Sequence, residues 1–201
     1  MNMISQEKTT ILVLTHNYPR FKGCAMAPFV GVLVENLAKH SKMIVLAPRH
    51  NWAVPERNGV KLEYFKYSFK SWEKLSYTGN LFAKVRGIKP HYQFLGFCYL
   101  ISYILKSFSV AKREKPDIIH SQWFVPSGLV GHITSLLTGI PHIVTVHSDS
   151  FLVKKNKILR AVAKIIFRRA KMVIAVSQSV KEHVVDIAPR IRVIYPCNQM
   201  F

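Results

Sequence analysis

The sequence predicts an α/β fold built on a doubly wound, Rossmann-like parallel sheet. Short apolar runs recur along the chain, most of them β-branched and continuous, which is typical of strands with both faces buried. Segments long enough to form helices separate these runs. The chain has 201 residues, of which 49% are hydrophobic, enough to bury the core of a single α/β domain.

The expected strands of the sheet are Ile11–Leu14, Met43–Ala47, Asp117–Ile119, Ile143–Val146, Met172–Val176 and Arg192–Tyr195. Apolar and polar residues alternate more clearly in Val60–Tyr67, so we expect that strand at an edge of the sheet. The stretches Asn51–Asn58 and Ser76–Pro90 are predicted to be loops.

Helix signals mark several of the segments between the strands. Ala27–His40 has a proline in its first turn, where a missing N–H costs nothing. Ser127–Thr138 likewise follows a proline, and Gly139 is a typical residue to end it. Gln178–Asp186 is predicted to be a short helix. A further segment, Tyr92–Ala111, contains a single charge and could by length span a bilayer. We favour a buried core helix there, with a membrane span or an interfacial helix as the alternatives.

The charge balance favours an anionic partner. Lys and Arg number 29 against 10 Asp and Glu, giving a net charge of +19. Phosphate, an acidic membrane and nucleic acid would all fit, and a basic protein without such a partner is the alternative. The three cysteines, Cys24, Cys98 and Cys197, are far apart, which predicts a reducing cytosol and neither disulfides nor a metal site. The N-terminus does not have the pattern of a signal peptide.

Polar residues gather where the predicted strands end, and ligands bind beyond the carboxyl ends of strands in open α/β sheets. Single members of the group, such as Asp149 and Ser177, could instead cap helices. Taken together, the group predicts a ligand site, and we expect these residues to bind substrate: His16, Asn17, His120, Trp123, Asp149 and Ser177.

Several familiar sites are excluded by spacing. The chain contains no GxGxxG, no GxxxxGK[ST] and no GxSxG motif. His142 and His147 lie five residues apart on one strand, so they point to opposite faces and cannot share a metal. No pair of carboxylates has the pattern of a glycoside hydrolase. We therefore predict no metal site and no cofactor.

Three segments resemble the N-terminal domain of family 4 glycosyltransferases, in the order and spacing of that family. They are ILVLTHNYPRFKGCAMAPFVGVLVENLAKH, PDIIHSQWFVPSGLVGHITSLLTGIPHIVTVHSD and AKMVIAVSQSVKEHV. The resemblance implies a GT-B enzyme that transfers a sugar from a nucleotide diphosphate with retention. It also implies that residues 1–201 form the acceptor-side domain and lack the C-terminal domain that binds the donor.

The resemblance assigns two site residues. His147 matches the histidine that lies beside the transferred sugar, and it is the expected catalytic residue. Gly23 matches the loop that cradles the donor diphosphate. The chain departs from the family pattern where Cys24 follows Gly23, where Ser148 replaces a common glycine, and in having no E-x7-E pair.

Two basic segments suggest a membrane surface. Lys154–Lys171 contains eight basic residues and no acid, and Arg57–Pro90 interleaves basic and aromatic residues. On a helical projection, Lys157, Arg160 and Lys164 share a face with Arg168 and Lys171, and the isoleucines lie roughly opposite. A cytoplasmic protein, peripheral at the inner face of the plasma membrane, is the expectation. A solvated helix face is the alternative, and nucleic acid is less favoured because no nucleic-acid-binding module accompanies it.

The function that follows is transfer of a sugar to a lipid-linked or cell-surface glycan acceptor. A donor-binding half would be needed, either on a longer chain or as a separate chain. The alternative is a non-catalytic basic module that binds membrane or an anionic polymer.

Overall fold

The computed structural model describes residues 8–21, 24–51, 53–69, 73, 75–76 and 90–196. These residues form an eight-stranded sheet in the order β3-β4-β2-β1-β5-β6-β7-β8. Every pairing is parallel except that of β3 with β4. The strands are β1 (Thr10–Leu14), β2 (Lys42–Pro48), β3 (Glu56–Arg57), β4 (Val60–Phe65), β5 (Ile118–Gln122), β6 (His142–Val146), β7 (Met172–Ala175) and β8 (Ile191–Val193).

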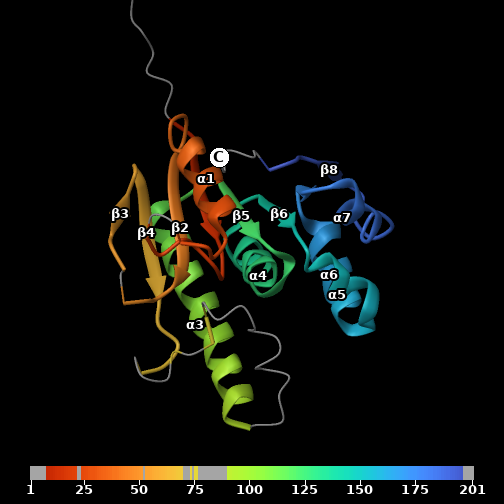
Figure 1. The fold of residues 1–201 in the computed structure, drawn as a ribbon, viewed down its shortest axis with the longest axis horizontal. Helices are drawn as coiled ribbons and strands as arrows, with labels where there is room; N and C mark the ends of the chain where they lie inside the picture. The colour runs from red at the N-terminus through yellow and green to blue at the C-terminus, as the bar shows by residue number, and fades with distance from the viewer. Residues whose placement is uncertain are drawn as a thin grey trace, which may run out of the picture.

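Helices cover both faces of this sheet, as the doubly wound fold requires (Figure 1). They are α1 (Pro28–Leu37), α3 (Pro90–Glu114), the helical turn η2 (Phe124–Gly128), α4 (Leu129–Thr138), α5 (Ser150–Lys155), α6 (Lys157–Arg169) and α7 (Gln178–Glu182). On one face α1 packs against residues such as Val13 and Val45. On the other, α3 and α6 pack against residues such as Leu14 and Val144. The predicted fold class is therefore confirmed.

The strand order reverses between β1 and β5. From β1 the chain builds outward through β2 and β4, and it then returns to the other side of β1 with β5. At such a switch point the connections leave in opposite directions, which opens a crevice at the carboxyl ends of the two strands. The residues that follow β1 and β5 therefore face each other across this crevice.

The structure corrects two strand boundaries. The strand predicted at Asp117–Ile119 extends to Gln122, because the residues from Ile119 to Gln122 pair with β6. His120 thus lies within a strand and not beyond its end. A short strand, β3, also lies in the stretch predicted to be a loop, and it places β4 one position inside the edge.

Helix α3 is a core helix on one side only. Its buried residues, which include Leu95, Tyr99 and Tyr103, pack on the sheet. The opposite side exposes an apolar stripe, the α3 stripe, made of Phe94, Phe97, Ile101 and Leu105. By length and composition alone α3 could cross a membrane, which is weak evidence for a span. The expectation of a buried helix is thus correct for one side of α3.

The predicted division of α6 into a basic face and an opposite apolar face is wrong. Ile158 and Ile165 are exposed, at 76% and 58%, on the same side as the basic residues, whereas Ile166 is buried. Arg160 is half-buried and forms an ion pair with Asp186, whereas Lys157, Lys164 and Arg168 are exposed. A helical projection from sequence cannot fix which side of a helix meets the sheet, since that depends on packing.

Helix α4 lies unusually close to β5 and β6 at Gly131. A Cβ at this position would stand 2.3 Å from Ser121 Oγ and 2.4 Å from His142 Nε2. Those two atoms hydrogen-bond each other at 2.8 Å, and Ser121 Oγ also donates to the Ser127 carbonyl at 3.0 Å. The absence of a side chain at Gly131 therefore sets the distance between α4 and the sheet.

Gly131→Ala should lower the free energy of unfolding by about 2 kcal/mol or more, because the methyl group must displace a buried, hydrogen-bonded pair. Urea unfolding would measure the loss. The control is Gly59→Ala, where a Cβ meets no atom within 4 Å but φ is +74°, so a loss of about 1 kcal/mol is expected. A Gly131→Ala loss no larger than that of the control would refute the close packing of α4.

Candidate functional site

Four rings from separate segments meet across the switch point. His16, which follows β1, lies with its ring centroid 4.5 Å from that of Trp123, which follows β5. Trp123 in turn lies 4.7 Å from His147, at the end of β6. Phe29, in the first turn of α1, lies 5.0 Å from His147 and 5.8 Å from Trp123. Two imidazoles and two larger aromatic rings therefore pack together where β1, β5 and β6 end, and we call the surroundings of these four rings the histidine crevice.

A buried network of hydrogen-bonded side chains fixes the orientation of His147. Gln122 Oε1 lies 3.0 Å from His147 Nε2, and Gln122 Nε2 lies 3.2 Å from His120 Nε2. Thr145 Oγ1 lies 2.8 Å from the same His120 nitrogen. An amide nitrogen can only donate and an amide oxygen can only accept. In this amide orientation the proton of His147 is on Nε2, which leaves Nδ1 as a hydrogen-bond acceptor.

Asp149 ties together the loops that follow β5 and β6. Its Oδ2 accepts from the Phe124 backbone N–H at 2.7 Å, and its Oδ1 accepts from the His147 backbone N–H at 2.8 Å. Burial raises the pKa of Asp149 to about 7, and these backbone donors partly oppose the shift. A single carboxyl group thus holds the backbone on both sides of the ring cluster.

Trp123 has a backbone conformation that residues other than glycine rarely adopt, with φ 69° and ψ 147°. Such a conformation persists only where the surroundings impose it. Here the Trp123 N–H donates to the Thr145 carbonyl at 2.9 Å, and the Trp123 carbonyl accepts from the Gly128 N–H at 3.0 Å. These two hydrogen bonds aim the indole ring across the crevice.

The histidines of the site are held neutral. Burial lowers the pKa of His16 to about 3 and that of His120 to about 4. Burial, followed by electrostatic repulsion from a protonated His120, lowers the pKa of His147 to about 4. Because each ring is uncharged at neutral pH, the crevice offers polar atoms for hydrogen bonding without a fixed charge beside the reacting groups.

The structure brings together five of the residues predicted to form the site, which are His16, His120, Trp123, His147 and Asp149. The other predicted residues are placed differently. Asn17 closes a turn in which its N–H donates to Thr15 Oγ1 at 3.2 Å. Ser177 caps α7 by accepting from the Val180 N–H at 3.2 Å. Gly23 lies outside the described residues. The binding roles given to these residues stay predictions.

Three residues of the site were not among those predicted to bind substrate. Gln122 and Thr145 orient the histidines, and Phe29 packs against His147. Gln122 lies two residues after His120, so a longer predicted strand would have placed both side chains on the same face. Thr145 and Phe29 carry no comparable signal, because their contacts depend on strand register and on the docking of α1.

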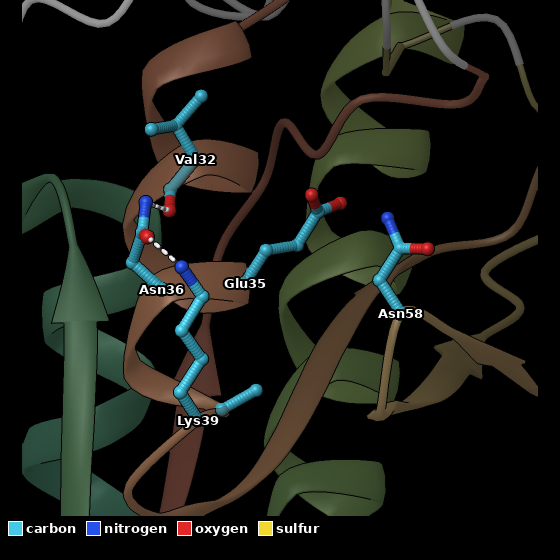
Figure 2. Close-up of a pocket in the computed structure, with 6 residues that line it drawn as sticks. Val32, Glu35, Asn36, Lys39 and Asn58 are labelled. Atoms are coloured by element: carbon cyan, nitrogen blue, oxygen red, sulfur yellow. Dashed lines mark hydrogen bonds between the residues drawn. The ribbon is translucent and has the colours of Figure 1, made fainter.

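Two hollows flank the outer side of α1. One, of about 420 Å³, is lined by Val32, Glu35, Asn36, Ala38, Lys39 and Asn58 (Figure 2). A second, of about 680 Å³, shares some of this lining and extends to Pro19, Phe21 and Arg57. In the first, Lys39 Nζ donates to Asn36 Oδ1 at 2.9 Å, and Asn36 Nδ2 donates to the Val32 carbonyl at 2.9 Å. The polar groups of the first hollow already bond one another, and the second is lined mostly by apolar residues and by none of the site histidines. We therefore assign the chemistry to the histidine crevice.

In the part of the chain that the structure describes, no group of three or more His, Cys, Asp or Glu residues could hold a metal ion. Cys24 is buried and Cys98 half-buried, and both are free thiols.

The neutral histidines predict a marked loss of stability in mild acid. Four of them, His16, His120, His142 and His147, have a folded-state pKa of about 3 or 4 against 6.5 when unfolded. The stability that they provide is fully present above pH 6.5 and is lost as the pH falls, because protons bind to the unfolded chain first. Between pH 7.5 and 5.5 each histidine should lower the free energy of unfolding by about 1.4 kcal/mol. The raised pKa of Asp149 acts in the opposite direction and should increase the free energy of unfolding by about 2 kcal/mol over the same range.

The free energy of unfolding should therefore fall by roughly 4 kcal/mol between pH 7.5 and 5.5. Urea unfolding at the two pH values measures the difference. In His147→Gln, which removes a titrating ring, the difference should shrink by about 1.4 kcal/mol. Equal stability at the two pH values would show that the histidines titrate normally in the folded protein.

Sequence comparison supports a glycosyltransferase. Residues 28–197 match the sequence profile of Glycosyltransferase Family 4. Over 134 residues the chain is 29% identical to an uncharacterized glycosyltransferase of Methanocaldococcus jannaschii. That alignment covers 65% of this chain and 32% of the relative.

Comparison with solved structures shows a shared fold at low sequence identity. Alr3699/HepE of Anabaena, solved in complex with UDP-glucose, has a TM-score of 0.59 at 17% identity, over 93% of this chain and 43% of that chain. The UDP-N-acetylglucosamine 2-epimerase of Rickettsia bellii has a TM-score of 0.56 at 14% identity, over 93% of this chain and 44% of that one. The N-terminal domain of Candida albicans trehalose-6-phosphate phosphatase has a TM-score of 0.60 at 11% identity, over 94% of this chain and 44% of that one.

This chain thus spans about a third of the length of its curated relative and fewer than half of the residues of these solved chains. Its fold corresponds to the N-terminal half of a GT-B structure. The profile match covers most of the chain, and the protein therefore belongs to Glycosyltransferase Family 4.

Proposed function

We propose that the chain is the acceptor-side half of a retaining glycosyltransferase. It would act with a donor-binding half to move a sugar from a nucleotide diphosphate to a lipid-linked or cell-surface glycan. The observation that carries this proposal is the position of His147 at the switch point, held by Gln122 and packed against Trp123. Family membership and the UDP-glucose bound to Alr3699/HepE support a nucleotide sugar as the donor.

In this proposal His147 orients the transferred sugar. Its Nδ1 accepts a hydrogen bond from a sugar hydroxyl, while Nε2–H stays bonded to Gln122 Oε1. Transfer with retention develops positive charge on the sugar ring and negative charge on the departing diphosphate. A neutral imidazole can position the sugar without repelling the developing positive charge, whereas a protonated ring would oppose it.

The aromatic rings beside His147 would provide the apolar part of the sugar site. Trp123 and Phe29 present surfaces on which the C–H groups of a sugar ring could pack while its hydroxyls meet polar atoms. The loop after β1, which contains Gly23, would receive the diphosphate through backbone N–H groups, as the family resemblance implies. Glycan transfer can then begin only when an acceptor reaches the same crevice.

His147→Ala should reduce turnover by about 100-fold or more in the enzyme assembled with its donor-binding half, because a positioned group in contact with the sugar is lost. Release of the nucleoside diphosphate from UDP- and GDP-sugars, in the presence of acceptor, would measure turnover. His40→Ala, an exposed histidine beyond the end of α1, is the matched control and should leave turnover unchanged.

Thermal unfolding would separate a catalytic role from a structural one. If His147→Ala has the melting temperature of the wild type and its turnover stays within a few-fold of the wild-type value, the catalytic assignment is wrong. If no nucleotide sugar supports transfer by the assembled enzyme, a non-catalytic basic module becomes the better explanation.

Gln122→Leu should release the orientation of His147 and slow turnover by about tenfold or more, because Gln122 positions the ring without touching the sugar. The direct readout is ¹⁵N NMR of the histidine side chains. The wild type should show His147 protonated on Nε2, and the variant should show a mixture of both tautomers. Ser121→Ala, on the same strand and the opposite face, is the control. A variant that keeps the Nε2–H form of His147 would show that Gln122 does not set the tautomer.

A further inference from the structure

Helices α5 and α6 present a surface on which exposed apolar and basic residues are mixed. The exposed apolar residues are Phe151, Ile158 and Ile165. The exposed basic residues around them are Lys154, Lys155, Lys157, Lys164, Arg168 and Arg169. We call this set the α5–α6 surface. Ser150–Arg169 contains no acidic residue.

The geometry of α6 arranges these residues in adjacent rows. Ile158 and Ile165 are seven residues apart, which is two helical turns, and Lys157 and Lys164 repeat the spacing one residue earlier. On α5, Lys155 Nζ lies 4.4 Å from the centroid of the Phe151 ring. Each apolar side chain therefore has a cationic neighbour.

The fold does not need these apolar residues for its core. The inner side of α6 already packs on the sheet through Ala163, Ile166 and Phe167, all fully buried. Phe151, Ile158 and Ile165 expose about half or more of their surface. Apolar side chains held outward among cations suit a boundary that is apolar inside and anionic at its surface.

We propose that the α5–α6 surface docks on an anionic lipid bilayer. The cations would meet the phosphate-bearing headgroups, and Phe151, Ile158 and Ile165 would enter the region between headgroups and acyl chains. Nucleic acid would attract the same cations, but binding to its phosphates gives isoleucine side chains no role. This inference is independent of glycosyl transfer.

The position of the surface fits this role. Helix α5 begins just after β6, on the side of the sheet where the carboxyl ends of the strands form the histidine crevice. In Figure 1, α5 and the yellow-green, amino end of α3 lie toward the lower part of the molecule. The α3 stripe is also apolar, but no lysine or arginine lies among the exposed residues from His91 to Leu105. It thus lacks the charge complementarity that the α5–α6 surface has.

The test is co-sedimentation of the purified protein with vesicles of phosphatidylglycerol and phosphatidylcholine in equal parts, and with vesicles of phosphatidylcholine alone. We expect binding to the anionic vesicles only. Replacing Lys154, Lys157, Lys164 and Arg168 by Gln in one variant should weaken binding to the anionic vesicles about 100-fold, because each cation near an anionic surface adds to the binding free energy. The matched control replaces Lys8, Lys39, Lys112 and Lys115 with Gln. It removes the same charge at the opposite, amino edge of the sheet, and binding should change only a few-fold.

A second variant tests the apolar contribution. Replacing Phe151, Ile158 and Ile165 together with Ser should weaken vesicle binding about tenfold without changing the net charge. Leu136→Ser with Leu137→Ser is its control, because both leucines are exposed, at 54% and 59%, at the amino end of the sheet. Thermal unfolding should confirm that all four variants fold as the wild type does.

Three outcomes would overturn the proposal. The first is an equal loss of binding when Lys154, Lys157, Lys164 and Arg168 are replaced and when the four control lysines are replaced, which would show attraction by net charge alone. The second is unchanged binding after the Ser substitutions at Phe151, Ile158 and Ile165. The third is a duplex oligonucleotide that binds more tightly than the vesicles and depends on the same cations, which would identify a nucleic-acid surface.

Discussion

The site depends on the carboxyl group of Asp149. Its two oxygens accept from backbone N–H groups of the loops that follow β5 and β6, at Phe124 and His147. Directly before the Phe124 anchor, Trp123 is held in a backbone conformation that it would not adopt alone. The carboxyl group is buried and bonds only to backbone, so any change that moves one loop also moves the other. The rings of Trp123 and His147 therefore behave as one unit whose geometry is set before a ligand arrives.

The sequence was most informative where a residue's place follows from the backbone alone. His16 and His147 could be assigned to the rim because each follows a continuous apolar strand, and parallel strands end at the same edge. Gln122 was taken to lie beyond its strand, because the end of β5 is set by pairing with Thr145 on β6. The exposure of Ile158 could not be derived either, since it depends on how α6 is rotated against the sheet. What the sequence left open is thus decided by contacts between elements far apart in the chain.

The electrostatics of the protein are divided between its surface and its interior. The chain carries a net charge of +19, yet the rings in the crevice are neutral because burial lowers the pKa of His16 and His147. The surface charge acts over about a Debye length in solution and can draw in anionic ligands. The crevice itself then presents hydrogen bonds and aromatic surface. Under the proposed function, a nucleotide sugar would meet long-range attraction first and a neutral, shaped site second.

The switch point also has a consequence for how the chain folds. Strand β1 lies at the centre of the sheet, but its partner β5 begins at Ile118, and the Thr10 N–H donates to the Asp117 side chain 107 residues along the chain. Closing so long a loop costs entropy before any contact offsets it, and chains rich in such distant pairings fold slowly. Until β5 arrives, β1 presents an unpaired and almost entirely apolar edge. During synthesis that edge stays unpaired until more than a hundred further residues have been added. It is therefore the part of the protein where we expect aggregation and chaperone binding to begin.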